Sequence, residues 1–193
     1  LRTPAGRWVL FDAGRSWSGG DAGRATIIPY LRRRGGAVYA FVLSHPHSDH
    51  VGGGASTLAA TDPNEYWDGA YVTGSADYRA SLAEAARLRV AWRRVHPGDS
   101  LALDGVHIRF LAPDSAWTAS LKDPNEASAV ALAQYGQVRF LMTGDAEAGE
   151  EAWMLARDAA ALRADVLKVG HHGSSTSSTP AFLDAVQPKL ALI

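Results

Sequence analysis

The 193-residue sequence contains no cysteine, which excludes disulfide bonds and thiolate metal ligands. No apolar run reaches the roughly 18 residues needed to cross a membrane, and no signal-peptide pattern opens the chain. There is also no charge of one sign in excess, because the formal net charge is −1, which argues neither for nor against a polyanionic partner. The length and composition of the chain are typical of one globular domain with a substantial core.

The two ends of the chain indicate that it is cut from a longer protein. The first residue is Leu1 rather than Met, and the chain stops within the apolar run 190–193. The termini therefore do not decide where the protein is located.

Basic residues gather in two places, Arg32–Arg34 and a second group made of Arg87, Arg89, Arg93 and Arg94. These clusters are either solvated faces or contacts for nucleic acid, and the pattern favours neither.

The most informative stretch is a cluster of histidines followed by glycines, His45-Pro46-His47-Ser48-Asp49-His50-Val51-Gly52-Gly53-Gly54. Imidazole and carboxylate are the ligands that zinc and similar divalent ions prefer in a chain without cysteine. In an extended segment, His45 and His47 share a face and are expected to bind one ion together. A turn after them would redirect Asp49 and His50 toward a second ion. The spacing predicts a binuclear metal site.

Further acidic or imidazole residues follow predicted strands. Asp12 ends one strand, Asp145 follows the Gly turn after an apolar strand, and the pair His171-His172 follows a third. An Asp in such a place is often only a turn residue or helix cap. Asp145 is the exception we favour, because a two-metal site needs a carboxylate that bridges ions roughly 3.5–4 Å apart.

Apolar periodicity and turn residues predict the elements around these residues. Strands are expected near residues 1–3, 8–11, 38–44, 101–103, 106–111, 129–135, 138–142, 166–169 and 189–193. Helices are expected over 77–91, 148–162 and 180–186, the last opened by Thr179 as N-cap and Pro180 at the first helical position. We expect a single α/β domain over residues 1–193, with sheets covered by helices.

In this order, the motifs resemble the metallo-β-lactamase fold superfamily, and more closely its ComEC-like branch, the hydrolase domain of bacterial competence proteins. Four stretches carry the resemblance: Thr3-Pro4-Ala5-Gly6-Arg7 to Asp12-Ala13-Gly14, Ser44 to Gly53, Asn125-Glu126-Ala127-Ser128 to Asp145, and Asp165 to Ser174. The resemblance implies a metallo-β-lactamase-type four-layer αβ/βα sandwich with two divalent metal ions, zinc or alternatively manganese. It also implies an extracellular or cell-surface location.

By the same resemblance, His45 and His47 would bind the first metal, and Asp49, His50 and His171 or His172 the second. Asp145 would bridge the ions. Asp12 would not bind metal itself but would orient the ligand side chains. Of the adjacent pair we favour His171 as ligand and His172 as the residue that faces substrate, although the reverse assignment is open.

The sequence departs from many superfamily members in the ligands of the first metal. In many members the region before the bridging Asp supplies a third His to the first metal. This chain has Asn125 and Ser128 there instead, as do relatives in the ComEC-like branch. Water or a carbonyl oxygen would then complete that site.

These residues predict a metal-dependent hydrolase in which two cations lower the pKa of water toward about 7 and neutralise charge in the transition state. Asp49 or His172 would act as the general acid or base that transfers the proton during hydrolysis. Ser174 and the two hydroxyl residues after it would either donate hydrogen bonds to substrate or serve only as turn residues.

The resemblance favours phosphodiester substrates, and DNA cleavage and small-molecule phosphodiester hydrolysis both stay open. Two other functions use the same residues: a lactam, lactone or thioester hydrolase, and a metal-stabilised module without catalysis.

Overall fold

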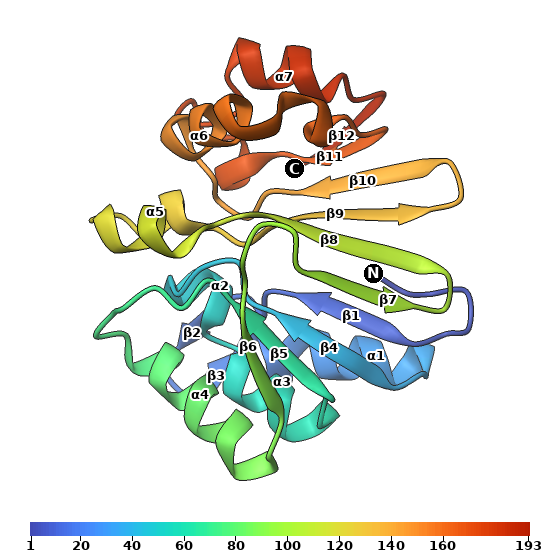
Figure 1. Cartoon of the computed structure of the whole chain (residues 1–193). Coiled ribbons are helices and arrows are strands. Elements are labelled where there is room, and N and C mark those ends of the chain that lie inside the picture. Colours follow the sequence, from blue (N-terminus) through green and yellow to red (C-terminus); the bar gives the residue numbers. More distant parts are fainter. The chain divides into compact units, whose positions relative to one another are not determined.

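The first half of the chain builds a sheet whose four strands are all parallel. The computed structural model describes residues 1–193, which divide into two compact units, Leu1–Arg94 and Val95–Ile193 (Figure 1). In the first unit the strand order is β1-β4-β5-β6. The bounds are β1 Trp8–Phe11, β4 Val38–Val42, β5 Glu65–Asp68 and β6 Ala91–Arg94.

Helices and one small hairpin complete the first unit. They are β2 Ser16–Trp17, β3 Gly20–Asp21, the π-helical turn η1 Gly23–Ile27, α1 Ile28–Arg34, α2 Ser48–Val51, α3 Gly54–Thr61 and α4 Ala76–Leu88. Helix α4 begins where the Ser75 hydroxyl accepts a hydrogen bond from the Tyr78 N–H, and it ends at Arg89 in the left-handed conformation. Phe41, Tyr66 and Leu58 are fully buried and join this helical layer to the sheet.

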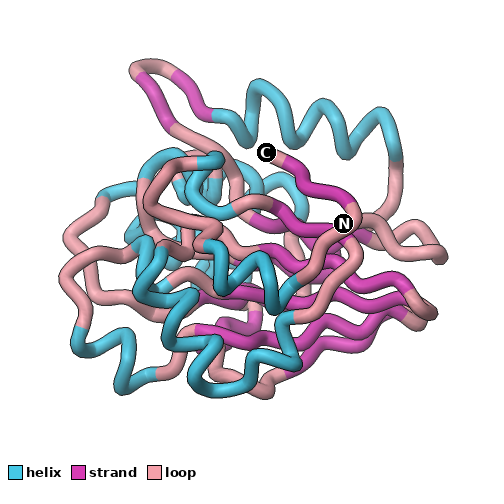
Figure 2. The backbone as a smooth tube through the Cα atoms, turned by 90° about the horizontal axis from the view of Figure 1, so that it is seen from above, coloured by secondary structure: helices cyan, strands magenta, loops and turns pink.

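The second unit is built on a six-stranded sheet in the order β12-β11-β10-β9-β8-β7. Strands β7 to β10 are antiparallel neighbours, whereas β11 and β12 join β10 in parallel; the strands of each sheet lie side by side (Figure 2). The bounds are β7 Ser100–Leu103, β8 Val106–Ala112, β9 Val130–Tyr135, β10 Val138–Met142, β11 Val166–Lys168 and β12 Leu190–Leu192.

The helices of this unit are α5 Ser115–Ser120, η2 Asn125–Ala127, α6 Ala148–Asp158, η3 Ala159–Leu162, η4 Gly170–Gly173 and α7 Pro180–Val186. Leu141 and Leu167 pack from the sheet against Met154, Leu162 and Phe182 from the helices. This core fixes the strand ends that carry Asp145 and the histidine pair.

Most predicted elements are present, with shifts at their ends. The helix predicted over 77–91 is α4, and the one predicted over 148–162 ends as an α-helix at Asp158 and continues as a 3₁₀ turn. The predicted strand at residues 1–3 is reduced to one antiparallel bridge between Arg2 and Trp8. Hydrogen bonds between Leu1 and Val9, and from the Thr3 N–H to the Arg7 carbonyl, flank this bridge around the Pro4–Gly6 turn. Helix α3 and strands β5 and β6 were not predicted. The prediction of a single domain over 1–193 stays a prediction.

No helix is long and apolar enough to span a membrane.

Candidate metal centre

The first group of candidate ligands lies where the parallel strands of the first sheet end. Asp12 follows β1, and Ser44 and His45 follow β4. Carboxyl ends of parallel strands meet at one edge of a sheet, which is a common place for ligand sites in α/β proteins. The chain then turns into α2, whose first turn carries Asp49 and His50. The turn that the sequence predicted after His47 is therefore present.

Asp12 holds two other residues of this edge through its carboxylate. It accepts hydrogen bonds from the Ser44 N–H at 2.7 Å and the Ser44 hydroxyl at 2.8 Å. Its Oδ2 also lies 2.8 Å from His50 Nδ1, which therefore carries the proton as donor. Asp12 has φ of 60°, a left-handed conformation that Asp and Asn tolerate better than most residues.

These bonds also decide which nitrogen of each buried histidine carries the proton. Since Ser44 gives its only hydroxyl proton to Asp12, its oxygen is an acceptor toward His45 Nδ1, 3.1 Å away. His45 and His50 therefore both keep their proton on Nδ1 and present an Nε2 lone pair. Oriented tautomers of this kind are typical of metal-binding histidines.

The spacing of the His45 and His47 nitrogens fits one shared cation. His45 Nε2 and His47 Nδ1 are 3.1 Å apart. Two nitrogens on one tetrahedral zinc, each about 2.0–2.1 Å from the ion, would be about 3.3 Å apart. Asp49 Oδ2 lies 3.8 Å from His50 Nε2, with the Asp49 side chain 53% exposed, so these two residues form a second pair of donor atoms. The donor set of this edge fits divalent metal ions.

We predict that Asp12→Asn lowers metal affinity by about 10- to 100-fold, because the amide has a single acceptor oxygen and cannot accept from both the Ser44 N–H and His50 Nδ1. Chelator-competition titration of the metal measures the change. Asp62→Asn is the matched control, since Asp62 is exposed and left-handed but lies at the end of α3. Equal affinity in Asp12→Asn and wild type would show that Asp12 does not orient a ligand.

The second group of candidate ligands lies beyond β10 in the second unit. Asp145 follows a turn at Gly144, which has φ of 55°, and is 3% exposed. Its N–H donates to the buried Ser128 hydroxyl at 3.0 Å. His172 Nε2 lies 3.4 Å from Asp145 Oδ2. Asp145 and His172 therefore present their polar atoms to the same point.

His171 faces a different carboxylate from its neighbour. Its Nδ1 lies 2.6 Å from Glu147 Oε1 and 3.1 Å from the Thr176 hydroxyl. Both histidines have left-handed backbones, with φ of 44° and 52°, so their side chains diverge as the sequence predicted. His172, rather than the favoured His171, is the one beside Asp145.

Glu147 is a site residue that sequence reasoning missed. It also accepts a hydrogen bond from the Asn125 amide at 3.2 Å, so it joins Asn125 to His171. Its position just before α6 is that of an ordinary N-cap, yet its side chain caps no helical N–H. In the sequence, the only sign of a site role for Glu147 is its position two residues after Asp145. That position is equally typical of a helix cap.

Ser174 is engaged within its own loop. Its hydroxyl accepts hydrogen bonds from the Thr176 N–H at 3.3 Å and the Thr176 hydroxyl at 3.0 Å. This arrangement favours the turn role over the substrate role.

A buried carboxyl supports Ser128 from behind. Glu150 is fully buried; its Oε2 accepts from the Ser128 N–H at 3.1 Å, and its Oε1 has no hydrogen-bond partner. Burial raises the pKa of Glu150 well above its ordinary value. Repulsion from Glu126 and Glu151 adds to this rise, and the Ser128 bond opposes it.

Because the pKa of Glu150 is raised in the folded protein, the free energy of unfolding decreases as pH rises. The folded state holds this proton more tightly than the unfolded chain, so stability is lost as pH rises from about 4.3 through the raised pKa. Glu150→Gln removes the ionisable group, so the Tm of the variant relative to that of wild type should rise as pH increases. Thermal melts across pH test this. Glu84→Gln is the control, because hydrogen bonds from Arg87 lower the pKa of partly exposed Glu84, and it should show no such gain. A constant Tm difference would contradict the prediction.

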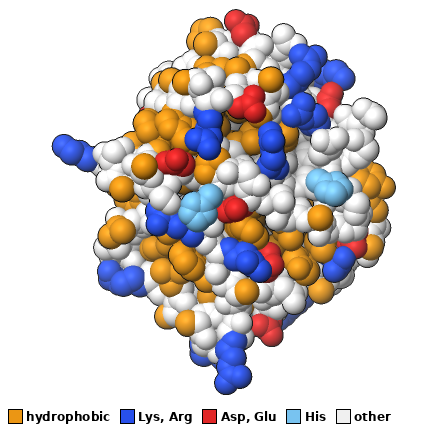
Figure 3. Space-filling model, viewed as in Figure 1, with side chains coloured by type: hydrophobic (Ala, Val, Ile, Leu, Met, Phe, Trp, Pro, Cys, Tyr) orange, Lys and Arg blue, Asp and Glu red, His pale blue; other side chains and the backbone are white.

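The two predicted basic clusters differ in their surroundings. Arg32–Arg34 are exposed in the last turn of α1, and Arg87 pairs with Glu84 at 2.6 Å. Figure 3 shows Lys and Arg side chains on one face separated by acidic and apolar ones.

Comparisons with known proteins agree with these motifs. The model of the metallo-beta-lactamase superfamily matches residues 1–193. The chain is 37% identical over 189 residues to Recombination protein 2 of Haemophilus influenzae, covering 97% of this chain and 21% of that protein. It is 32% identical over 189 residues to Competence protein ComA of Neisseria gonorrhoeae, covering 97% of this chain and 24% of that protein. The chain thus spans less than a quarter of these curated relatives.

Among solved structures, a metallo-β-lactamase of Cronobacter sakazakii has a TM-score of 0.58 at 15% identity, covering 97% of this chain and 82% of that one. This likeness confirms the predicted α/β fold class of the metallo-β-lactamase type. The chain belongs to the metallo-β-lactamase superfamily, and its similarity to recombination and competence proteins confirms the ComEC-like branch.

Proposed function

We propose that this protein is a metal-dependent hydrolase of phosphodiester bonds. Membership of the superfamily supports hydrolysis with divalent metal ions in general. The observation that carries the proposal is the pair of imidazole nitrogens 3.1 Å apart, together with Nδ1 tautomers that turn Nε2 of His45 toward His47 and Nε2 of His50 toward Asp49. An arrangement that only packs a core would not need three hydrogen bonds to a left-handed Asp12.

In this proposal His45 and His47 would hold one ion, and Asp49, His50 and His172 the other, with Asp145 as bridge. We propose zinc, because imidazole-rich sites suit it, with manganese as the alternative. When bound, the ions would supply Lewis acidity and activate water.

The remaining residues would orient and protect this site. Asp12 and Ser44 would keep the two buried imidazoles in the required tautomer, and Ser128 would fix the backbone of Asp145. Asp49, as the exposed carboxylate, would accept the proton that water releases. His171 would be held through Nδ1 by Glu147 and would present Nε2 to substrate.

The choice of phosphodiesters is supported by the relatives. They are named for recombination and competence, which favours DNA among phosphodiester substrates. A two-metal site also suits in-line displacement at phosphorus.

Turnover of a chromogenic bis-aryl phosphodiester by the metal-loaded protein tests the proposal, with a chromogenic lactam measured in parallel. Hydrolysis of the phosphodiester that is lost on metal removal is the expected result. Hydrolysis of the lactam alone would move the assignment to carbonyl substrates. Bound metal without turnover of either substrate would indicate a module stabilised by metal and without catalysis.

A further inference from the structure

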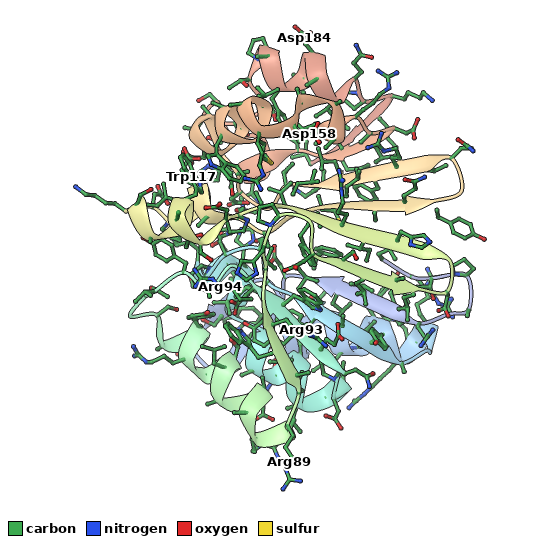
Figure 4. The ribbon with its side chains drawn as sticks, viewed as in Figure 1. Arg89, Arg93, Arg94, Trp117, Asp158 and Asp184 are labelled. Atoms are coloured by element: carbon green, nitrogen blue, oxygen red, sulfur yellow. The ribbon has the colours of Figure 1, made fainter.

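Arg94 lies at the same edge of the first sheet as the candidate ligands. It is the last residue of β6 and is paired in register with Asp68, the last residue of β5. The four strands are parallel, so Asp12, Ser44, Asp68 and Arg94 all follow or end strands at one edge. Figure 4 shows Arg89 and Arg94 at opposite ends of β6.

The carboxylate beside Arg94 is already satisfied by other donors. Asp68 is 2% exposed, and it accepts hydrogen bonds from the Tyr78 hydroxyl at 3.0 Å, Trp92 Nε1 at 3.1 Å and the Ala70 N–H at 2.7 Å. Burial raises the pKa of Asp68; these bonds and the charge of Arg94 oppose the rise. Arg94 therefore attracts Asp68 without an ion pair to it, and its buried Nε has no hydrogen-bond partner.

The neighbouring arginine is engaged in a way that Arg94 is not. Arg93 Nε lies 3.2 Å from Glu65 Oε1, and its guanidinium lies over the Trp67 ring at 5.5 Å from the centroid. Successive residues of a strand point to opposite faces, so Arg93 and Arg94 serve different sides of the sheet. Of these two adjacent arginines, Arg94 is the one whose buried Nε has no hydrogen-bond partner within the protein.

We propose that Arg94 binds a phosphate of a nucleic-acid substrate, next to the phosphate that is cleaved. The proposal rests on the phosphodiesterase function proposed above. β5 separates β6 from β4, so the Arg94 backbone is about 9–10 Å from the strand that carries His45. This distance suits a neighbouring phosphate along a chain better than the phosphate at the metals. A guanidinium offers the planar, charge-assisted donors that phosphate oxygens accept.

The test compares Arg94→Gln with the matched control Arg93→Gln in the 193-residue chain. Binding of a fluorescently labelled oligothymidylate is measured by anisotropy over a range of salt, with chelator present to prevent cleavage. For Arg94→Gln we expect about tenfold weaker binding, and a slope of log K against log salt that is smaller by about 0.7, the loss of one phosphate contact. With metal restored, KM for the same oligonucleotide should rise more than kcat falls. Arg93→Gln should match wild type in both readouts.

Two results would overturn the proposal. One is wild-type affinity and salt slope in a folded Arg94→Gln protein; a lowered Tm alongside it would show that Arg94 only stabilises Asp68. The other comes from Arg94→Lys, which keeps the charge if Arg94→Gln fails to fold: a lost salt slope in that variant contradicts phosphate binding. The proposed function fails separately, because it requires cleavage by the wild type, whereas this test requires only binding.

Discussion

Asp145→Ala is expected to abolish hydrolysis, by about a thousandfold or more, and to deplete bound metal. The carboxylate is 3% exposed and lies beside His172, so its removal takes away the proposed bridge between the ions. The fold should survive, because Asp145 holds Ser128 through its backbone N–H, which alanine retains. Turnover of the bis-aryl phosphodiester and the metal content of the purified protein are the two measurements.

Asp184→Ala is the control for this change. Asp184 is exposed on α7, away from β10 in the fold of the second unit (Figure 4). It should retain wild-type turnover and metal. Normal turnover in Asp145→Ala would remove this residue from the site, and equal losses in both variants would point to general destabilisation.

His172→Ala and His171→Ala are expected to separate the roles of the two adjacent histidines. His172 Nε2 lies 3.4 Å from Asp145, so its removal should lower both metal content and turnover, the latter by about a hundredfold or more. His171 is held by Glu147 and Thr176, so its removal should lower turnover while metal content stays near that of wild type. Metal titration and kinetics on the same preparations measure both effects.

Opposite results would restore the assignment that the sequence favoured. If His171→Ala loses metal and His172→Ala keeps it, His171 is the ligand. Glu147→Gln provides a further check, because it should resemble His171→Ala in keeping metal and losing turnover. The reason is that an amide at this position replaces the carboxylate 2.6 Å from His171 Nδ1.

Chemistry at the strand ends was predicted from local pattern. Three histidines and an Asp within six residues identify a metal-binding type because those side chains are rarely grouped otherwise. The apolar strands before Ser44 and Asp145 were likewise visible, since short apolar runs between turn residues mark buried strands. These local signals sufficed for the family, which the comparisons then confirmed.

Other features depended on contacts between residues far apart in the chain. Helix α3 begins at the last of three consecutive glycines, and β6 is largely exposed and charged, so neither carries a clear periodic signal. Glu147 looks like a helix cap until Asn125 and His171 are brought against it. No spacing rule relates residues more than twenty positions apart.

The sequence by itself determined the metal-ligand types, the fold family and the positions of most strands, because each follows from side-chain chemistry or from short-range periodicity. Only the tertiary structure decided which nitrogen of His45 and His50 carries the proton, which histidine of the pair lies beside Asp145, and which arginine has a buried Nε without a hydrogen-bond partner. The physical reason is that tautomers, ion pairs and desolvation depend on partners that folding brings together from distant parts of the chain.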